Sequence, residues 1–90
     1  MAKTIWKFEF GDAVLLTTPP LHDPRVVLVA QQDEVLPTVW VEHGGTDPAG
    51  QRLELVVVGT GHPIPPGHEH MGSAVCGGFV WHIYGVTVRG

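Results

Sequence analysis

Short runs of β-branched and aromatic residues, separated by glycine and proline, constrain the fold of this chain more than any other feature. Apolar and polar residues alternate over 4–10, which places Trp6, Phe8 and Phe10 on one side of an extended strand. No stretch has the spacing of apolar residues that is typical of an amphipathic helix. The sequence therefore predicts a fold built from strands.

The other predicted strands are bounded by turn residues. Pro19 and Pro20 end a short strand, because a proline cannot donate to a β-ladder. The glycine-rich segment 44–50 is expected to close a hairpin between the strands on either side of it. The apolar runs 25–30 and 79–88 are expected to be covered on both faces. The predicted strands are 4–10, 13–17, 25–30, 38–42, 52–58 and 79–88.

Six or seven short strands in 90 residues favour a compact antiparallel barrel or sandwich, which we predict to be one all-β domain over 1–90. Hydrophobic residues make up 43% of the chain, a large apolar load for so small an interior. Part of this apolar surface is expected to be buried against another copy of the chain in a homo-oligomer.

The charge of the chain limits its partners. The formal net charge is −4, and the five basic residues are scattered along the sequence. Duplex nucleic acid is not an expected partner, because its binding requires clustered basic residues. Arg25 or Arg52 could still neutralise a phosphate of a small anionic ligand if an oligomer interface brings arginines together.

Signals for secretion or membrane insertion are absent from the sequence. The N-terminal residues lack the apolar core of a signal peptide, and no run approaches the ~18 apolar residues of a membrane helix. The single cysteine, Cys76, fits a reducing compartment. We therefore predict a cytoplasmic protein without a membrane partner, and the sequence indicates no cofactor.

A loop rich in glycine, proline and histidine, 59–70, is the favoured position of a binding site, since loops held by a rigid scaffold carry function. Its first residues allow a tight turn whose backbone N–H groups could bind an anion. Trp81 or Tyr84 could stack on a ligand ring, although aromatic side chains in sheets mostly pack against one another. The predicted ligand-binding residues are Gly59, Thr60, Gly61, His62, Trp81 and Tyr84, together with Arg25 and Arg52.

The segment His68-Glu69-His70 offers a metal-binding alternative. In an extended chain, its two histidines project to the same side about 6–7 Å apart. His62 or His82 could complete a set of three nitrogens and leave one position open for water. A solvated loop whose histidines hydrogen-bond locally is favoured, so no metal is predicted; if one binds, the expected ligands are His62, His68 and His70.

Four blocks of the sequence are distinctive when taken together: Ile5-Trp6-Lys7-Phe8, Val39-Trp40, Gly59-Thr60-Gly61-His62-Pro63-Ile64 and Val80-Trp81-His82. They resemble a small family of proteins encoded by tailed bacteriophages, a domain of unknown function. The resemblance spans essentially the whole chain and implies expression in the cytoplasm of an infected bacterium. It implies no catalytic residue.

Small phage proteins of this size often act by binding, and no residues here suggest catalysis. The only serine, Ser73, has no base that the sequence identifies. We therefore predict a non-enzymatic binding protein that counters host defence by sequestering a small anionic, nucleotide-type signal. The alternatives are a protein–protein inhibitor of a host defence protein, a metal-binding protein, and a minor structural or assembly factor of the phage.

Overall fold

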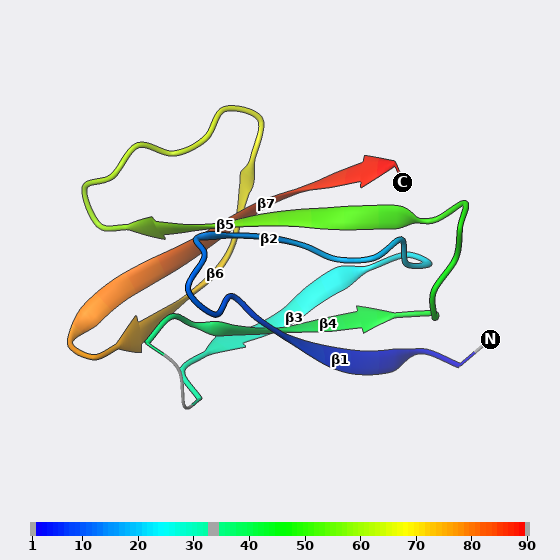
Figure 1. The fold of residues 1–90 in the computed structure, drawn as a ribbon, viewed down its shortest axis with the longest axis horizontal. Coiled ribbons are helices and arrows are strands. Elements are labelled where there is room, and N and C mark those ends of the chain that lie inside the picture. Colours follow the sequence, from blue (N-terminus) through cyan, green and yellow to red (C-terminus); the bar gives the residue numbers. More distant parts are fainter. Residues whose placement is uncertain (1, 33–34, 90) are drawn as a thin grey trace.

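The computed structural model describes residues 2–32 and 35–89, which form a sandwich of two antiparallel sheets (Figure 1). The sheets have the strand orders β1-β4-β3 and β2-β5-β7-β6. Neither sheet closes into a barrel, so of the two predicted all-β architectures the sandwich is confirmed. The strands are β1 (Thr4–Glu9), β2 (Leu15–Thr17), β3 (Arg25–Ala30), β4 (Thr38–His43), β5 (Gln51–Gly59), β6 (Glu69–Cys76) and β7 (Phe79–Arg89).

The core lies between the two sheets and follows the alternation of the strands. In β4, Val39 and Val41 are fully buried, whereas Trp40 between them is only half-buried. Phe8 and Trp6 of β1 lie opposite these two valines, so they share one side of the strand as predicted; Phe8 packs against the core, whereas Trp6 is 40% exposed. The buried members of the core are Phe10, Leu21, Val39, Val41, Leu53, Leu55, Val57 and Ile83.

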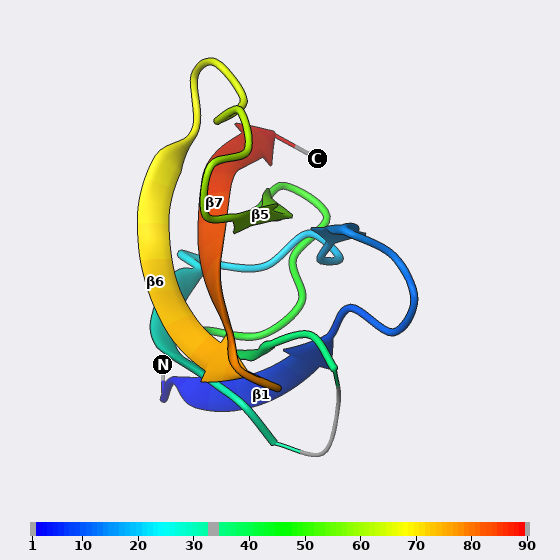
Figure 2. The same ribbon diagram turned by 90° about the vertical axis from the view of Figure 1, so that its left-hand side faces the viewer.

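The two layers, seen from the end in Figure 2, come closest where β3 packs against β6. A Cβ atom added at Gly72 of β6 would lie only 2.6 Å from Cγ2 of Val29 in β3. Because a methyl group cannot fit in that space, a glycine at this position allows the sheets to pack directly on each other.

The hairpin expected across 44–50 does not form. Strand β4 pairs only with β1 and β3, whereas β5 pairs with β2 and β7. The segment therefore carries the chain from one sheet to the other. Leu21 fixes this crossover, since its backbone N donates to the oxygen of Gln51 at 2.8 Å and its oxygen accepts from N of Gln51 at 2.9 Å.

One further expectation about the strands is wrong, and another is confirmed in part. Strand β3 is an edge strand with a bulge between Val26 and Leu28, and Leu28 is half exposed, so 25–30 is not covered on both faces. For 79–88, a central place in the sheet is confirmed, because β7 lies between β5 and β6, but within one chain only Ile83 and Gly85 of this strand are buried. Strand β6 lies outside the strands predicted from the sequence.

Thr18 is a fully buried residue that follows β2 and attaches it to β5. Its Oγ1 accepts a hydrogen bond from N of Leu53 at 2.9 Å. Thr18→Val keeps the shape of the side chain but leaves this N–H without a partner in the core. We expect the free energy of unfolding, measured with urea, to fall by about 1–3 kcal/mol. The exposed neighbour is the control: Thr17→Val should change stability by less than about 0.5 kcal/mol. Equal losses would contradict the role of the Thr18 hydroxyl.

Candidate functional site

A tight turn follows β5 at one end of the sandwich. N of His62 donates to the oxygen of Gly59 at 3.0 Å, which closes the turn over 59–62. Gly61 has a φ of 88°, a conformation that glycine adopts at little cost. Gly59 is still part of the ladder and lies opposite Trp81 of β7. The turn is therefore held beside an aromatic side chain by the regular pairing of two strands.

A hollow of about 250 Å³ lies between this turn and the start of β7. A Cβ atom at Gly59 would lie 2.9 Å from Nδ1 of His62 and 3.0 Å from Cζ3 of Trp81, so the absence of a side chain lets both rings approach the backbone. The ring centroids of Trp81 and Phe79 are 5.9 Å apart. We call this site the aromatic hollow; its lining residues are Gly59, Thr60, His62, Phe79, Val80 and Trp81.

A second, smaller hollow of about 190 Å³ adjoins the same turn. It shares Gly59, Thr60 and His62 with the aromatic hollow and adds His82 and Tyr84 of β7. We call it the histidine hollow. Its lining residues are Val58, Gly59, Thr60, Gly61, His62, Ile64, His82 and Tyr84. Together, the two hollows place an apolar, aromatic surface on one part of the turn and imidazole and phenol groups on another.

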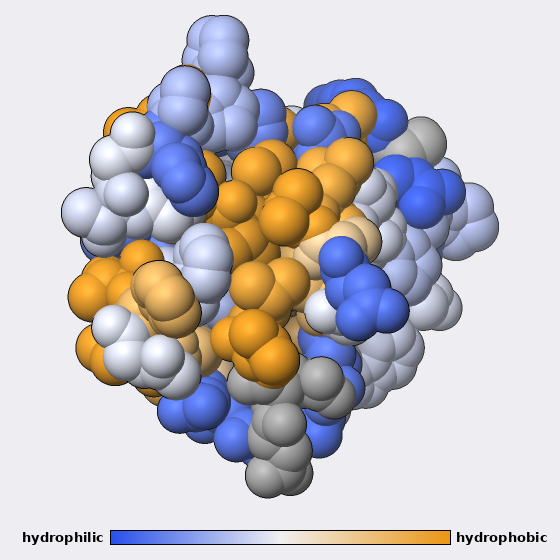
Figure 3. Space-filling model, turned by 60° about the vertical axis from the view of Figure 1, so that its left-hand side comes forward, coloured by the Kyte–Doolittle hydropathy of each residue, from blue (hydrophilic) through white to orange (hydrophobic). Residues whose placement is uncertain are grey.

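The end of the molecule that carries the turn also exposes apolar side chains. Figure 3 brings this end forward and shows hydrophobic residues gathered at its centre. Phe79 is 66% exposed, Val75 is 62% exposed and Ile64 of the loop is 54% exposed. The aromatic hollow, which Phe79 also lines, is therefore bordered by apolar surface.

The structure brings together six of the predicted ligand-binding residues and leaves the two arginines elsewhere. Gly59, Thr60, Gly61, His62, Trp81 and Tyr84 all line one hollow or both. Arg25 lies in the other sheet, with Nη2 3.5 Å from Oε2 of Glu42. Arg52 is seven residues before Gly59 along β5, which corresponds to about 24 Å. Within one chain, neither arginine reaches the turn, so phosphate neutralisation by Arg25 or Arg52 stays a prediction that requires a second copy.

The histidines of the loop are held separately. Nδ1 of His68 is 3.0 Å from the oxygen of Pro66, and its Nε2 is 3.7 Å from Oε1 of Glu54. Nε2 of His70 is instead 3.3 Å from Nδ1 of His82. Across 2–32 and 35–89, no three histidine, cysteine or acidic side chains converge as metal ligands. The set His62, His68 and His70 is therefore not assembled here, since His68 lies against Pro66 and Glu54 whereas His70 lies against His82.

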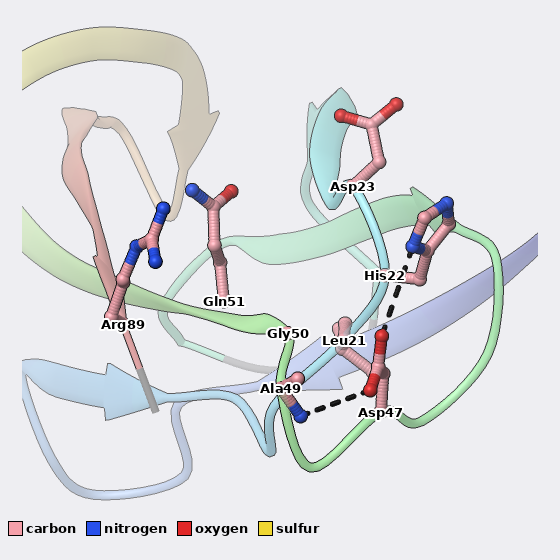
Figure 4. A pocket seen from close by; sticks show the side chains of 8 residues that line it. All are labelled: Leu21, His22, Asp23, Asp47, Ala49, Gly50, Gln51 and Arg89. Atoms are coloured by element: carbon pink, nitrogen blue, oxygen red, sulfur yellow. Dashed lines mark hydrogen bonds and ion pairs between the residues drawn. The ribbon is translucent and has the colours of Figure 1, made fainter.

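A larger hollow, of about 430 Å³, lies elsewhere and was not expected from the sequence. Figure 4 shows His22 and Asp47 on one side of it and Gln51 and Arg89 on the other. Oδ1 of Asp47 accepts from N of Ala49 at 2.9 Å, and its Oδ2 is 3.9 Å from Nδ1 of His22. Asp47 thus has its partners within the hollow. The hollow also lacks an aromatic surface, so it is a weaker candidate for a ligand with a ring.

His43 is a buried polar residue with a structural role. Its Nδ1 accepts from N of Gly45 at 2.9 Å, and its ring packs against Trp6 with centroids 4.2 Å apart. The ring is fully buried at the end of β4, away from the hollows at the turn. Strand alternation could have indicated its position, because it lies two residues beyond the buried Val41.

Cys76 is a buried thiol at the end of β6, and burial raises its pKa. A raised pKa leaves less thiolate at pH 8, and the thiolate is the form that reacts. We expect Ellman's reagent to modify the native protein at least about tenfold more slowly than the urea-unfolded protein. Equal rates, measured from the absorbance of the released thionitrobenzoate, would contradict this placement of the thiol.

Comparison with known protein families gives a match over almost the whole chain. The family model for DUF7352, a domain of unknown function, matches residues 1–89, so the chain belongs to this family. No curated protein and no solved structure matches the chain. Within the described residues, the structure has no helix with the length and apolarity to cross a membrane. The expected domain of unknown function is thus confirmed, and the bacteriophage origin stays a prediction.

Proposed function

We propose that this member of the DUF7352 family is a non-enzymatic binding protein whose ligand occupies the hollows at the 59–62 turn. The observation that carries this proposal is the close approach of His62 and Trp81 to Gly59. A strand pair, a tight turn and a missing side chain combine there to form a concave, partly aromatic site. Rigid elements position the lining groups, as binding requires.

The shape of the site favours a ligand with two chemically different parts. Each hollow alone is smaller than the ~300 Å³ at which ligand pockets commonly begin, but the two share Gly59, Thr60 and His62. A planar ring fits against Trp81 and Phe79, where stacking of a base contributes about 1–3 kcal/mol. A polar or anionic group then faces the turn, whose backbone N–H groups and His62 can donate hydrogen bonds.

A nucleotide-type molecule combines these two parts, and its capture needs no catalytic group. The described chain places no lysine or arginine at either hollow, so the anionic part of the ligand would depend on the turn and on histidine. The resemblance to bacteriophage proteins supplies the proposed setting, in which the protein sequesters a small signal of host defence in the cytoplasm of an infected bacterium.

Native mass spectrometry of untagged protein tests this function. The protein is incubated in buffer with EDTA, with and without a lysate of phage-infected, defence-active bacteria. We expect the lysate to add a discrete small-molecule mass to the protein. Protein that gains no small molecule from the lysate would contradict ligand capture.

A second candidate function follows from the apolar end of the molecule. Phe79, Val75 and Ile64 expose large apolar surfaces there, and such patches are typical of protein interfaces. Inhibition of a host defence protein would use this surface. The same spectra separate the candidates, because a protein partner adds a mass of thousands of daltons, and a second copy of the chain doubles the mass.

A further inference from the structure

His70 and His82 form a pair on the outer face of the four-stranded sheet. In β7, Ile83 points into the core, so its neighbours His82 and Tyr84 point outward. His70 of β6 lies opposite Tyr84, on the same face. The register shifts between His70 and Gly72, and the imidazoles of His70 and His82 meet diagonally across the two strands.

The distance between the two rings fits a shared metal ion. Nε2 of His70 lies 3.3 Å from Nδ1 of His82. With Zn–N bonds of about 2.0–2.1 Å, two nitrogens on a tetrahedral zinc ion lie about 3.3 Å apart. The same distance also allows a hydrogen bond between the two imidazoles, so the pair is held at the spacing of two metal ligands even without a metal.

We propose that His70 and His82 bind a divalent cation of intermediate softness, Zn²⁺ above all, with water in the remaining positions. Imidazole nitrogen is a preferred ligand of this class of ion. Tyr84 orients one of the ligands, since its ring meets that of His70 edge-on with centroids 5.3 Å apart. No third histidine, cysteine or acidic side chain of the described chain converges here, which leaves the ion accessible to solvent.

This pair differs from the metal set considered from the sequence. His68 does not belong to it, because Pro66 and Glu54 hold its ring. Each facing nitrogen must offer its lone pair to the metal, so a proton between the two rings moves to a far ring nitrogen or to solvent. Acid therefore competes with the metal for these nitrogens, and Zn²⁺ binding should weaken as the pH falls.

Calorimetric titration of untagged, EDTA-stripped protein with ZnCl₂ tests the site. We expect one ion per chain, and a loss of at least about tenfold in affinity for both His70→Gln and His82→Gln. His68→Gln and the distant His22→Gln should bind as the unmodified protein does. MgCl₂ should give no heat of binding, since Mg²⁺ prefers oxygen ligands.

The effect of His82→Gln on Zn²⁺ affinity shows whether the ion binds at this pair or at the histidines of the loop. Unchanged affinity in a folded His82→Gln variant would overturn the proposal, and so would absence of Zn²⁺ binding by the unmodified protein. If His82→Gln loses its fold, nitrogen-detected NMR of the unmodified protein replaces it. Zn²⁺ should then shift Nε2 of His70 and Nδ1 of His82, and shifts at other histidines alone would overturn the assignment. Ligand capture, tested in EDTA, does not depend on this outcome.

Discussion

Gly50→Ala is expected to destabilise the protein by about 3 kcal/mol or more, the largest loss among the substitutions considered. Gly50 is buried in the crossover between the sheets. A Cβ atom there would lie 2.7 Å from the carbonyl carbon of Leu21, would meet its oxygen more closely still, and would lie 3.0 Å from the oxygen of Asp47. These neighbours are backbone atoms and cannot rotate away. Their displacement would break the hydrogen bonds between Leu21 and Gln51.

Gly44→Ala is the matched control for the crossover. It introduces the same methyl group in the same connection, and neither glycine has a left-handed φ. The atoms crowded at Gly44 belong to the side chain of His22, with Cδ2 at 2.7 Å, and this side chain is 59% exposed and free to turn. We expect the free energy of unfolding of Gly44→Ala, measured with urea, to fall by less than about 1 kcal/mol. Equal losses of stability in the two variants would contradict the claim that the backbone atoms around Gly50 cause the larger loss.

Gly59→Ala is expected to reduce ligand retention at least about tenfold. The displaced rings would occupy the site, so that a ligand could neither stack on Trp81 nor reach the backbone N–H groups of the turn. The new methyl group would meet the rings of His62 and Trp81 at 2.9 and 3.0 Å and push them into the aromatic hollow. Gly59 ends β5 and His62 is exposed, so the sheets should remain folded. Retention is measured as the ligand-bound fraction in native mass spectra after incubation with lysate.

Gly44→Ala is also the control for ligand retention. Its methyl group likewise meets a histidine ring, that of His22, but away from both hollows at the turn. We expect it to retain ligand as the unmodified protein does. Undiminished retention by a folded Gly59→Ala protein would place the ligand outside the aromatic hollow.

Local patterns were sufficient to predict most strands but not their partners. Alternation in 4–10 correctly placed Trp6 and Phe8 on one side of the strand, opposite Val41 and Val39. The glycines of 44–50 indicated a turn, yet turn residues do not specify whether the chain returns to the same sheet or crosses to the other. That choice depends on long-range bonds such as those of Leu21, which no local window contains.

Strand β6 illustrates a second limit of sequence patterns. Its register shifts between His70 and Gly72, so the alternation of side chains is interrupted in the middle of the strand. Gly72 also weakens the pattern, although the structure needs it where Val29 of the other sheet approaches. Gly72, which the contact between the sheets requires, therefore makes β6 hard to predict from its own residues.

The candidate site was predictable where its residues follow from a single strand pair. Gly59 ends β5 opposite Trp81, so the turn and the aromatic ring meet through simple register. Arg25 lies in the other sheet and Arg52 at the far end of β5. Nothing in the local sequence around these arginines shows how far they lie from the turn. Their distance is set by the arrangement of strands in the two sheets.

NMR titration of ¹⁵N-labelled protein with adenosine monophosphate in EDTA tests the central claim most directly, since it reports where a nucleotide binds. Inorganic phosphate serves as the control without a ring. The proposed site predicts shifts of the backbone amides of 59–62 and of the indole N–H of Trp81 with the nucleotide, and much smaller shifts with phosphate. Resonances of the turn and of Trp81 that stay unchanged, or shifts confined to the hollow around His22 and Arg89, would contradict it.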